Sequence, residues 1–97
     1  MFKVTKIEVT TSPDGLGDLP EGLYVETAVE MIQNAYPGVE VEVELREVFQ
    51  TRIDLKIEET GPREEDWMEE RLGFECSETE HIGRILQDAF DAACSRV

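Results

Sequence analysis

The chain has 97 residues, 40% hydrophobic and 33% charged, a balance typical of one folded domain rather than a disordered acidic tail. Nine Lys and Arg against 23 Asp and Glu give a formal net charge of −14, which argues against direct binding to nucleic acid or to an anionic membrane and favours a basic partner. No apolar run reaches the roughly 18 residues of a membrane span, and the first residues, MFKVTKIEV, lack the apolar stretch of a signal peptide, so we expect a cytoplasmic protein.

The first predicted element is a strand over residues 6–10, where polar and apolar side chains alternate. Phe2 and Val4 fall out of phase with Ile7 and Val9. We therefore expect a β-bulge or a loose N-terminal lead before the regular part of this strand.

An amphipathic helix follows the turn-forming residues 12–17. We expect it to start at Asp18-x-x-Glu21, a capping pattern with Pro20 inside it, and to end before Pro37-Gly38. Its apolar positions recur at spacings of three and four and are Val25, Ala28, Val29, Ile32, Ala35 and Tyr36.

Two further strands are predicted by residues 38–48, GVEVEVELREV, and by residues 51–58. Residues 47–50 would then form the loop of a β-hairpin that pairs these strands with each other.

Three carboxylates, those of Glu40, Glu42 and Glu44, lie on the polar side of the second strand, about 6.5–7 Å apart. In the expected hairpin Glu44 would face Arg52, and Glu40 would face Lys56, which leaves Glu42 opposite Asp54. Two interpretations stay open: a solvated face with partly neutralised charges, or a surface that a partner binds.

An acidic insert is predicted over about residues 59–75, with a short helix at residues 63–72 that ends at Gly73. Its carboxylates include Glu64, Glu65, Asp66, Glu69 and Glu70. Four apolar residues of the insert are expected to pack it onto the core: Trp67, Met68, Leu72 and Phe74. Trp67 is surrounded by carboxylates in the sequence and could instead anchor an interface.

The last helix is predicted to open at a capping box, Ser77-x-x-Glu80. It carries one apolar stripe, Ile82, Ile85, Leu86, Ala89, Phe90 and Ala93. The order strand, helix, strand, strand, insert, helix predicts a single two-layer α+β domain over residues 1–97, with both main helices on one face of a small sheet and the other face bare.

The chain resembles the DinI family, the small DNA-damage-inducible proteins that bind RecA filaments and modulate their activity. Most of the chain outside residues 59–75 takes part in this resemblance. The matching pieces are Ile7-Glu8-Val9-Thr10, Ser12-Pro13, Leu19-Pro20-x-Gly22, Ile32-Gln33-x-Ala35-Tyr36-Pro37 and Ile82-x-x-Ile85-Leu86-Gln87-Asp88-x-Phe90-Asp91-x-Ala93.

This resemblance implies an acidic ridge on the last helix that imitates the phosphate backbone of DNA and contacts the DNA-binding loops of RecA. The acids that match the family are Glu78, Asp88 and Asp91. Arg84 stands where the family tends to be acidic, so the charge of this ridge is shifted toward the insert, which could mean a changed partner.

Other classes of function have little support in the sequence. His81, the only histidine, is expected to face solvent, and Glu78-x-x-His81 lacks the second motif of a di-iron site. Cys76 and Cys94 are expected to be reduced, half-buried thiols rather than a disulfide or a metal site. We expect no metal or other cofactor, and, because a small two-layer sheet with a bare face offers no obvious cleft, no enzymatic activity.

The expected function is binding to a basic nucleic-acid-binding protein, with the RecA filament as the favoured partner and the chain itself a monomer or weak homodimer. The alternative is a phage- or plasmid-encoded inhibitor that mimics nucleic acid and blocks a CRISPR effector, a restriction enzyme or a repressor.

Overall fold

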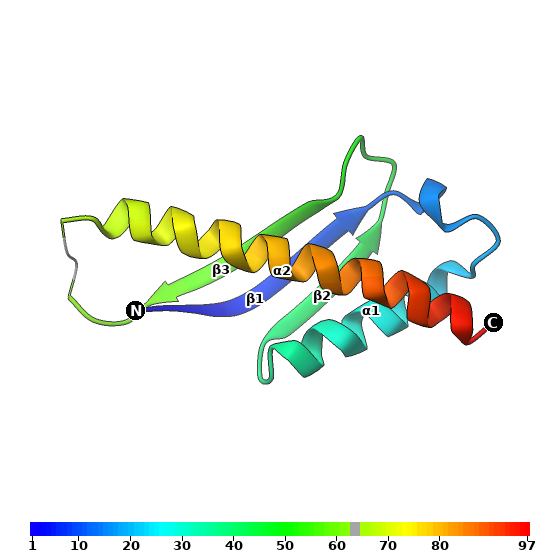
Figure 1. Ribbon diagram of the computed structural model, residues 1–97, viewed down its shortest axis with the longest axis horizontal. Coiled ribbons are helices and arrows are strands. Elements are labelled where there is room, and N and C mark those ends of the chain that lie inside the picture. The colour runs from blue at the N-terminus through cyan, green and yellow to red at the C-terminus, as the bar shows by residue number, and fades with distance from the viewer. Residues whose placement is uncertain (63–64) are drawn as a thin grey trace.

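The computed structural model describes residues 1–62 and 65–97, and these residues form three strands and two long helices (Figure 1). A 3-10 helix at Pro13–Leu16 follows the first strand. The strands and long helices are β1 (Phe2–Thr11), α1 (Glu21–Ala35), β2 (Glu40–Leu45), β3 (Arg52–Glu59) and α2 (Trp67–Ser95). The predicted α+β class and the order strand, helix, strand, strand, helix are confirmed.

The sheet has the strand order β2-β1-β3, with β1 in the centre. β1 pairs in parallel with β2 and in antiparallel with β3, so the predicted hairpin between the second and third strands is wrong. The chain leaves β2 at one edge, passes the end of β1 through residues 46–51 and enters β3 at the other edge. The central strand is also the most deeply buried on its inner face, where Ile7 and Val9 are 0% and 1% exposed.

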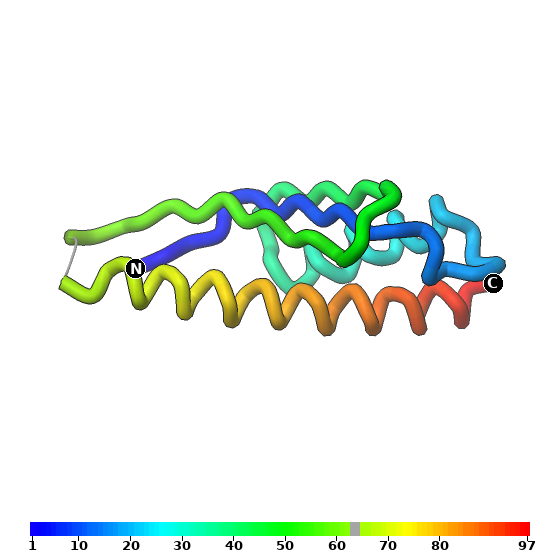
Figure 2. Tube along the Cα trace, turned by 90° about the horizontal axis from the view of Figure 1, so that it is seen from above, coloured from blue at the N-terminus to red at the C-terminus, as the bar shows by residue number. Residues whose placement is uncertain are grey.

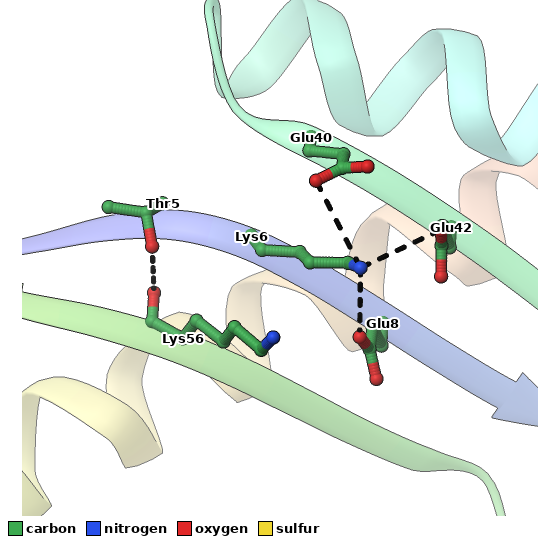
Figure 3. Close-up of polar contacts among 6 residues, drawn as sticks. All are labelled: Thr5, Lys6, Glu8, Glu40, Glu42 and Lys56. Carbon is green, nitrogen blue, oxygen red and sulfur yellow. Dashed lines mark hydrogen bonds and ion pairs between the residues drawn. The ribbon is translucent and has the colours of Figure 1, made fainter.

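A β-bulge divides β1, as the phase of its apolar residues predicted. The register against β3 shifts between Val4 and Lys6, and the hydroxyl of Thr5 donates a hydrogen bond to the carbonyl of Lys56 at 3.1 Å (Figure 3). The extra residue lets Val4 and Ile7 both point into the core, although they are three positions apart.

α1 begins at Glu21, with Pro20 in the N-cap position and no side-chain cap, so the capping pattern predicted at Asp18 is wrong. The chain before Pro20 instead makes a turn in which the N–H of Leu19 donates to the carbonyl of Leu16, and both leucines are buried. The helix ends at Ala35 as predicted. Gly38 then turns the chain toward β2 with a φ of 81°, a left-handed conformation that favours glycine.

α2 is one continuous helix of 29 residues and includes both the end of the insert and the predicted last helix. It passes through Gly73 and Ser77, so the predicted stop at Gly73 and the capping box at Ser77 are wrong. A glycine inside a helix costs only about 1 kcal/mol, and packing of the long apolar stripe outweighs this cost. At about 1.5 Å per residue α2 is roughly 43 Å long, most of the 50 Å long axis of the molecule (Figure 1).

The first turns of α2 are held to β1 by aromatic contacts. The ring of Phe2 lies 6.3 Å from that of Trp67 and 5.7 Å from that of Phe74, so the predicted packing of these two insert residues is confirmed. The same prediction is wrong for Met68 and Leu72, which are 69% and 58% exposed.

The helices pack against one face of the sheet, and Figure 2 shows α2 as a separate layer along the strands. The core joins residues of β1, β2, α1 and α2, among them Ile7, Val41, Ile32 and Ile82. The opposite face of the sheet carries charged side chains exposed to solvent. Within the described residues, neither long helix combines the length and apolarity that a membrane crossing requires.

Candidate acidic interaction surface

The solvent-facing side of α2 carries carboxylates toward both of its ends, with Glu80 between them. With 3.6 residues per turn, these acids lie opposite the buried residues Ile82, Ile85 and Ala89. We call this set the α2 ridge; its members, all exposed, are Asp66 at the N-cap, Glu69, Glu70, Glu80, Asp88 and Asp91.

The continuity of α2 joins acids that the sequence assigned to two separate elements. Asp66 and Asp91 are 25 residues apart on one axis, a distance of roughly 38 Å at about 1.5 Å per residue. Glu65 is also exposed and directly precedes the ridge. Glu64, another predicted site residue, lies outside the described residues.

Most of the ridge is not neutralised. Glu80 forms an ion pair with Arg84, at 2.9 Å between Oε1 and Nη2. For the remaining five members, the structure of residues 1–62 and 65–97 shows no ion pair. The ridge therefore has two clusters of free carboxylates, one at each end, separated by the Glu80–Arg84 pair and Ser77.

Glu78 does not belong to this ridge. It lies on the side of α2 that faces α1, where its carboxylate accepts a hydrogen bond from the hydroxyl of Tyr36. Burial raises the pKa of Tyr36, and the hydrogen bond to Glu78 raises that pKa further. Of the three acids that match the DinI pattern, the structure thus places Asp88 and Asp91 together in solvent and gives Glu78 a contact between the helices.

The acids of β2 lie on the bare face of the sheet, as expected, but next to β1. The register places Glu40, Glu42 and Glu44 opposite Lys6, Glu8 and Thr10, respectively. The predicted pairs of these acids with residues of the third strand are therefore wrong, because β1 lies between the two strands.

Lys6 is the centre of an ion-pair network on this face (Figure 3). Its Nζ lies 3.1 Å from Glu8, 3.6 Å from Glu42 and 4.0 Å from Glu40. The hydrogen bond to Glu8, together with the charges of Glu40 and Glu42, raises the pKa of Lys6 against the opposing effect of desolvation. The strand acids are partly neutralised, although by Lys6 of β1 and not by the residues of the third strand that were predicted to face them.

A row of three carboxylates crosses the bare face, since Glu8 lies opposite both Glu42 on β2 and Asp54 on β3. Each of the three has a cation within 4.0 Å, Lys6 for two of them and Arg52 for Asp54. Sequence reasoning missed Glu8 as a member of this face because it did not place the first strand in the centre. The bare face therefore carries screened acids, and the α2 ridge carries the larger share of free ones.

In the part of the chain that the structure describes, no cluster of three or more potential metal ligands occurs. His81 is exposed, as predicted, and its ring lies 5.8 Å from that of Tyr36. Cys76 and Cys94 are free thiols, and both are exposed rather than half-buried as expected.

A scan against protein-family models gives no match, and searches of curated proteins and of solved structures give none either. The resemblance to the DinI family therefore stays a prediction from the sequence motifs.

Proposed function

We propose that this protein binds the cationic nucleic-acid-binding surface of another protein through the α2 ridge. The observation that carries the proposal is the line of exposed carboxylates on one rigid helix, most of them without an ion pair among the described residues. A helix holds these charges in fixed positions, and a positively charged groove that normally accommodates phosphates is complementary to them.

The favoured partner is the RecA filament, because the sequence motifs resemble the DinI family. The second candidate is a CRISPR effector, a restriction enzyme or a repressor that a phage- or plasmid-encoded mimic inhibits. One observation favours this candidate: part of the free charge lies at the start of α2, at Asp66, Glu69 and Glu70. None of these three is among the acids that match the DinI pattern, which all lie further along the helix.

The test is association with RecA–single-stranded-DNA filaments, measured by fluorescence anisotropy at several salt concentrations. We expect affinity to fall as salt rises. The variant Glu69→Gln/Asp88→Asn/Asp91→Asn removes three ridge charges and is expected to weaken binding about tenfold or more, the equivalent of ~1.4 kcal/mol.

A matched control removes the same number of charges elsewhere. Glu21→Gln/Glu26→Gln/Glu47→Gln changes three exposed acids of α1 and the β2–β3 loop and has the same net charge as the ridge variant. If both triple variants weaken binding equally, only the net charge matters and the ridge is not the binding surface. If the wild-type protein does not bind the filament but a ridge-dependent complex forms with a restriction enzyme or CRISPR effector, the second candidate replaces the first.

A further inference from the structure

Within the described residues, β3 is an edge strand that pairs only with β1, and the backbone groups on its outer edge are aligned for another strand. The N–H of Thr60 donates to the carbonyl of Met1, the amino terminus donates to the carbonyl of Thr60, and the carbonyl of Lys56 accepts from Thr5. Successive residues of a strand direct their backbone N–H and C=O groups to opposite edges. The backbone groups of the even-numbered residues of β3 therefore point toward β1. The N–H and C=O groups of Ile53, Leu55 and Ile57 therefore lie at the free edge.

The apolar underside of β3 is only partly covered. Ile53, Leu55 and Ile57 are half-buried, and two hollows lie between α2 and the first two of them. The larger, of about 460 Å³, lies between Ile53 and a part of α2 that includes Phe90. The smaller, of about 230 Å³, is lined by Leu55 and Thr79, among others.

The α2 residues beneath β3 belong to a row that continues into solvent. Thr79, Leu86 and Phe90 line the two hollows. Positions three and four apart share one side of a helix, so the row continues from Thr79 through Glu75, which also lines the smaller hollow and is ion-paired with Arg71. Leu72 and Met68 then extend it toward the N-terminus of α2. These two side chains are 58% and 69% exposed. Figure 1 shows why: α2 crosses β3 at an angle, and its N-terminal half, in yellow, continues past the free edge.

The two edges of the sheet differ in whether an exposed part of a helix lies beneath them. Figure 1 shows α1 running close to β2, and Val41 on the inner side of β2 is buried. An added strand beside β2 would find no uncovered helix beneath it. Beside β3, an added strand would lie above the exposed Met68 and Leu72.

The outward side chains of β3 alternate in charge along the strand: Arg52, Asp54, Lys56 and Glu58. An antiparallel strand whose charges run cation, anion, cation, anion from its N-terminus would set an opposite charge against each of them. Its intervening residues would point to the helix layer and would have to be apolar.

The β3 strand of a second copy of this chain has the required charge pattern, but the α2 helix of that copy has no space beside the first. Antiparallel pairing of two β3 strands about Leu55 needs a twofold axis beside that residue. α2 passes beneath the same point, where Leu55 and Thr79 line one hollow. The two copies of α2 would therefore occupy the same volume, so the occupant must be a strand without a helix beneath it.

We propose that the free edge of β3 accepts an extended segment of a partner protein as a fourth, antiparallel strand, with aliphatic residues alternating with charges in the order cation, anion, cation, anion. Backbone hydrogen bonds at Ile53, Leu55 and Ile57 supply affinity, and side chains packed on Leu72 and Met68 supply selectivity. This edge is separate from the α2 ridge, so the inference does not depend on the proposed function.

The probe is a synthetic peptide with the sequence of residues 51–59, TRIDLKIEE, which carries the complementary pattern and has no helix attached. We expect it to bind the full chain and to slow hydrogen exchange at the amides of Ile53, Leu55 and Ile57. Exchange at Asp54 and Lys56, whose backbone groups face β1, is expected to change little.

Two matched peptides separate strand pairing from general adhesion. N-methylation at the peptide positions equivalent to Ile53, Leu55 and Ile57 removes the groups that face β3 and is expected to abolish binding. N-methylation at the positions equivalent to Asp54 and Lys56 modifies the opposite edge and is expected to preserve binding.

Charge reversal tests the register. Lys56→Glu in the protein places two acids opposite each other and is expected to weaken peptide binding about tenfold, because like charges directly opposite destabilise a strand pair. Exchanging the peptide aspartate for lysine should restore affinity to this variant.

The proposal is overturned if both methylated peptides bind equally, if exchange does not slow at the odd-numbered amides, or if Lys56→Glu has no effect. Dimerisation of the free chain through β3, detected by sedimentation and protection of the same amides, would also contradict it. Removal of charges from the α2 ridge is expected to leave peptide binding unchanged, because the two surfaces are distinct.

Discussion

The hydroxyl of Tyr36, just after α1, donates a hydrogen bond to the carboxylate of Glu78, near the middle of α2. This bond joins two helices that are separated in the chain by β2 and β3. It also explains why one acid of the predicted site is unavailable to a partner: its charge is used to position α2 against the end of α1.

Tyr36→Phe is expected to destabilise the fold by about 1 kcal/mol. Hydrogen bonds to charged groups contribute about 1.5–3 kcal/mol, and partial exposure of this pair reduces that value. The measurement is urea unfolding followed by circular dichroism. Tyr24→Phe is the control, because Tyr24 is buried but its hydroxyl has no side-chain partner among the described residues. An equal loss in both variants would mean that the hydroxyl–carboxylate bond contributes nothing specific.

The same bond predicts a dependence of stability on alkaline pH. The pKa of Tyr36 is raised above its ordinary value of 10.0, by burial and then by Glu78. The folded state therefore keeps this proton to higher pH than the unfolded state, and the contribution of Tyr36 is complete below about pH 10 and decreases above it. The difference in unfolding free energy between wild type and Tyr36→Phe should be constant from pH 7 to 9 and shrink above 10. If this difference in unfolding free energy instead grew with pH, folding would lower the pKa of Tyr36 and not raise it.

The sequence predicted the strands and the amphipathic helices well because their periodicities are local. Alternation at β2 and β3 was clear, and the phase break between Val4 and Ile7 located the bulge. Strand pairing is not local, however. The short connection of residues 46–51 favoured a hairpin, and only the insertion of β1 between β2 and β3 decides the matter.

The candidate site shows the same limit. The resemblance to the DinI family implied one exposed ridge of Glu78, Asp88 and Asp91. Asp88 and Asp91 are exposed, but Glu78 is turned toward Tyr36, a contact that the local sequence does not reveal because Tyr36 belongs to another element. Gly73 and Ser77 resembled a helix end and a helix start. The competing effect was tertiary: a single helix buries a longer apolar stripe than two short ones, and this gain exceeds the cost of one internal glycine.

Lys6→Gln is expected to lower the melting temperature by several degrees at low salt. The substitution leaves Glu8, Glu40 and Glu42 without the cation that lies within 4.0 Å of each. High salt screens their mutual repulsion and should reduce the difference from wild type. Lys3→Gln is the matched control, since it removes the same charge from an exposed position of β1. Equal effects of the two substitutions at low salt would show that the melting temperature depends only on the net charge and not on the contacts of Lys6.

Gly73→Ala and Ser77→Ala together test whether α2 is continuous. Inside a helix, Gly73→Ala should stabilise by about 0.5–1 kcal/mol, and an added Cβ meets nothing within 4 Å. Ser77→Ala should be neutral or slightly stabilising, because a serine inside a helix caps nothing. If two helices met here, the glycine would close the first and the serine would cap the second, so both substitutions would destabilise, Ser77→Ala by about 1 kcal/mol. Gly38→Ala, at a φ of 81°, supplies the destabilising reference in the same chemical unfolding experiment.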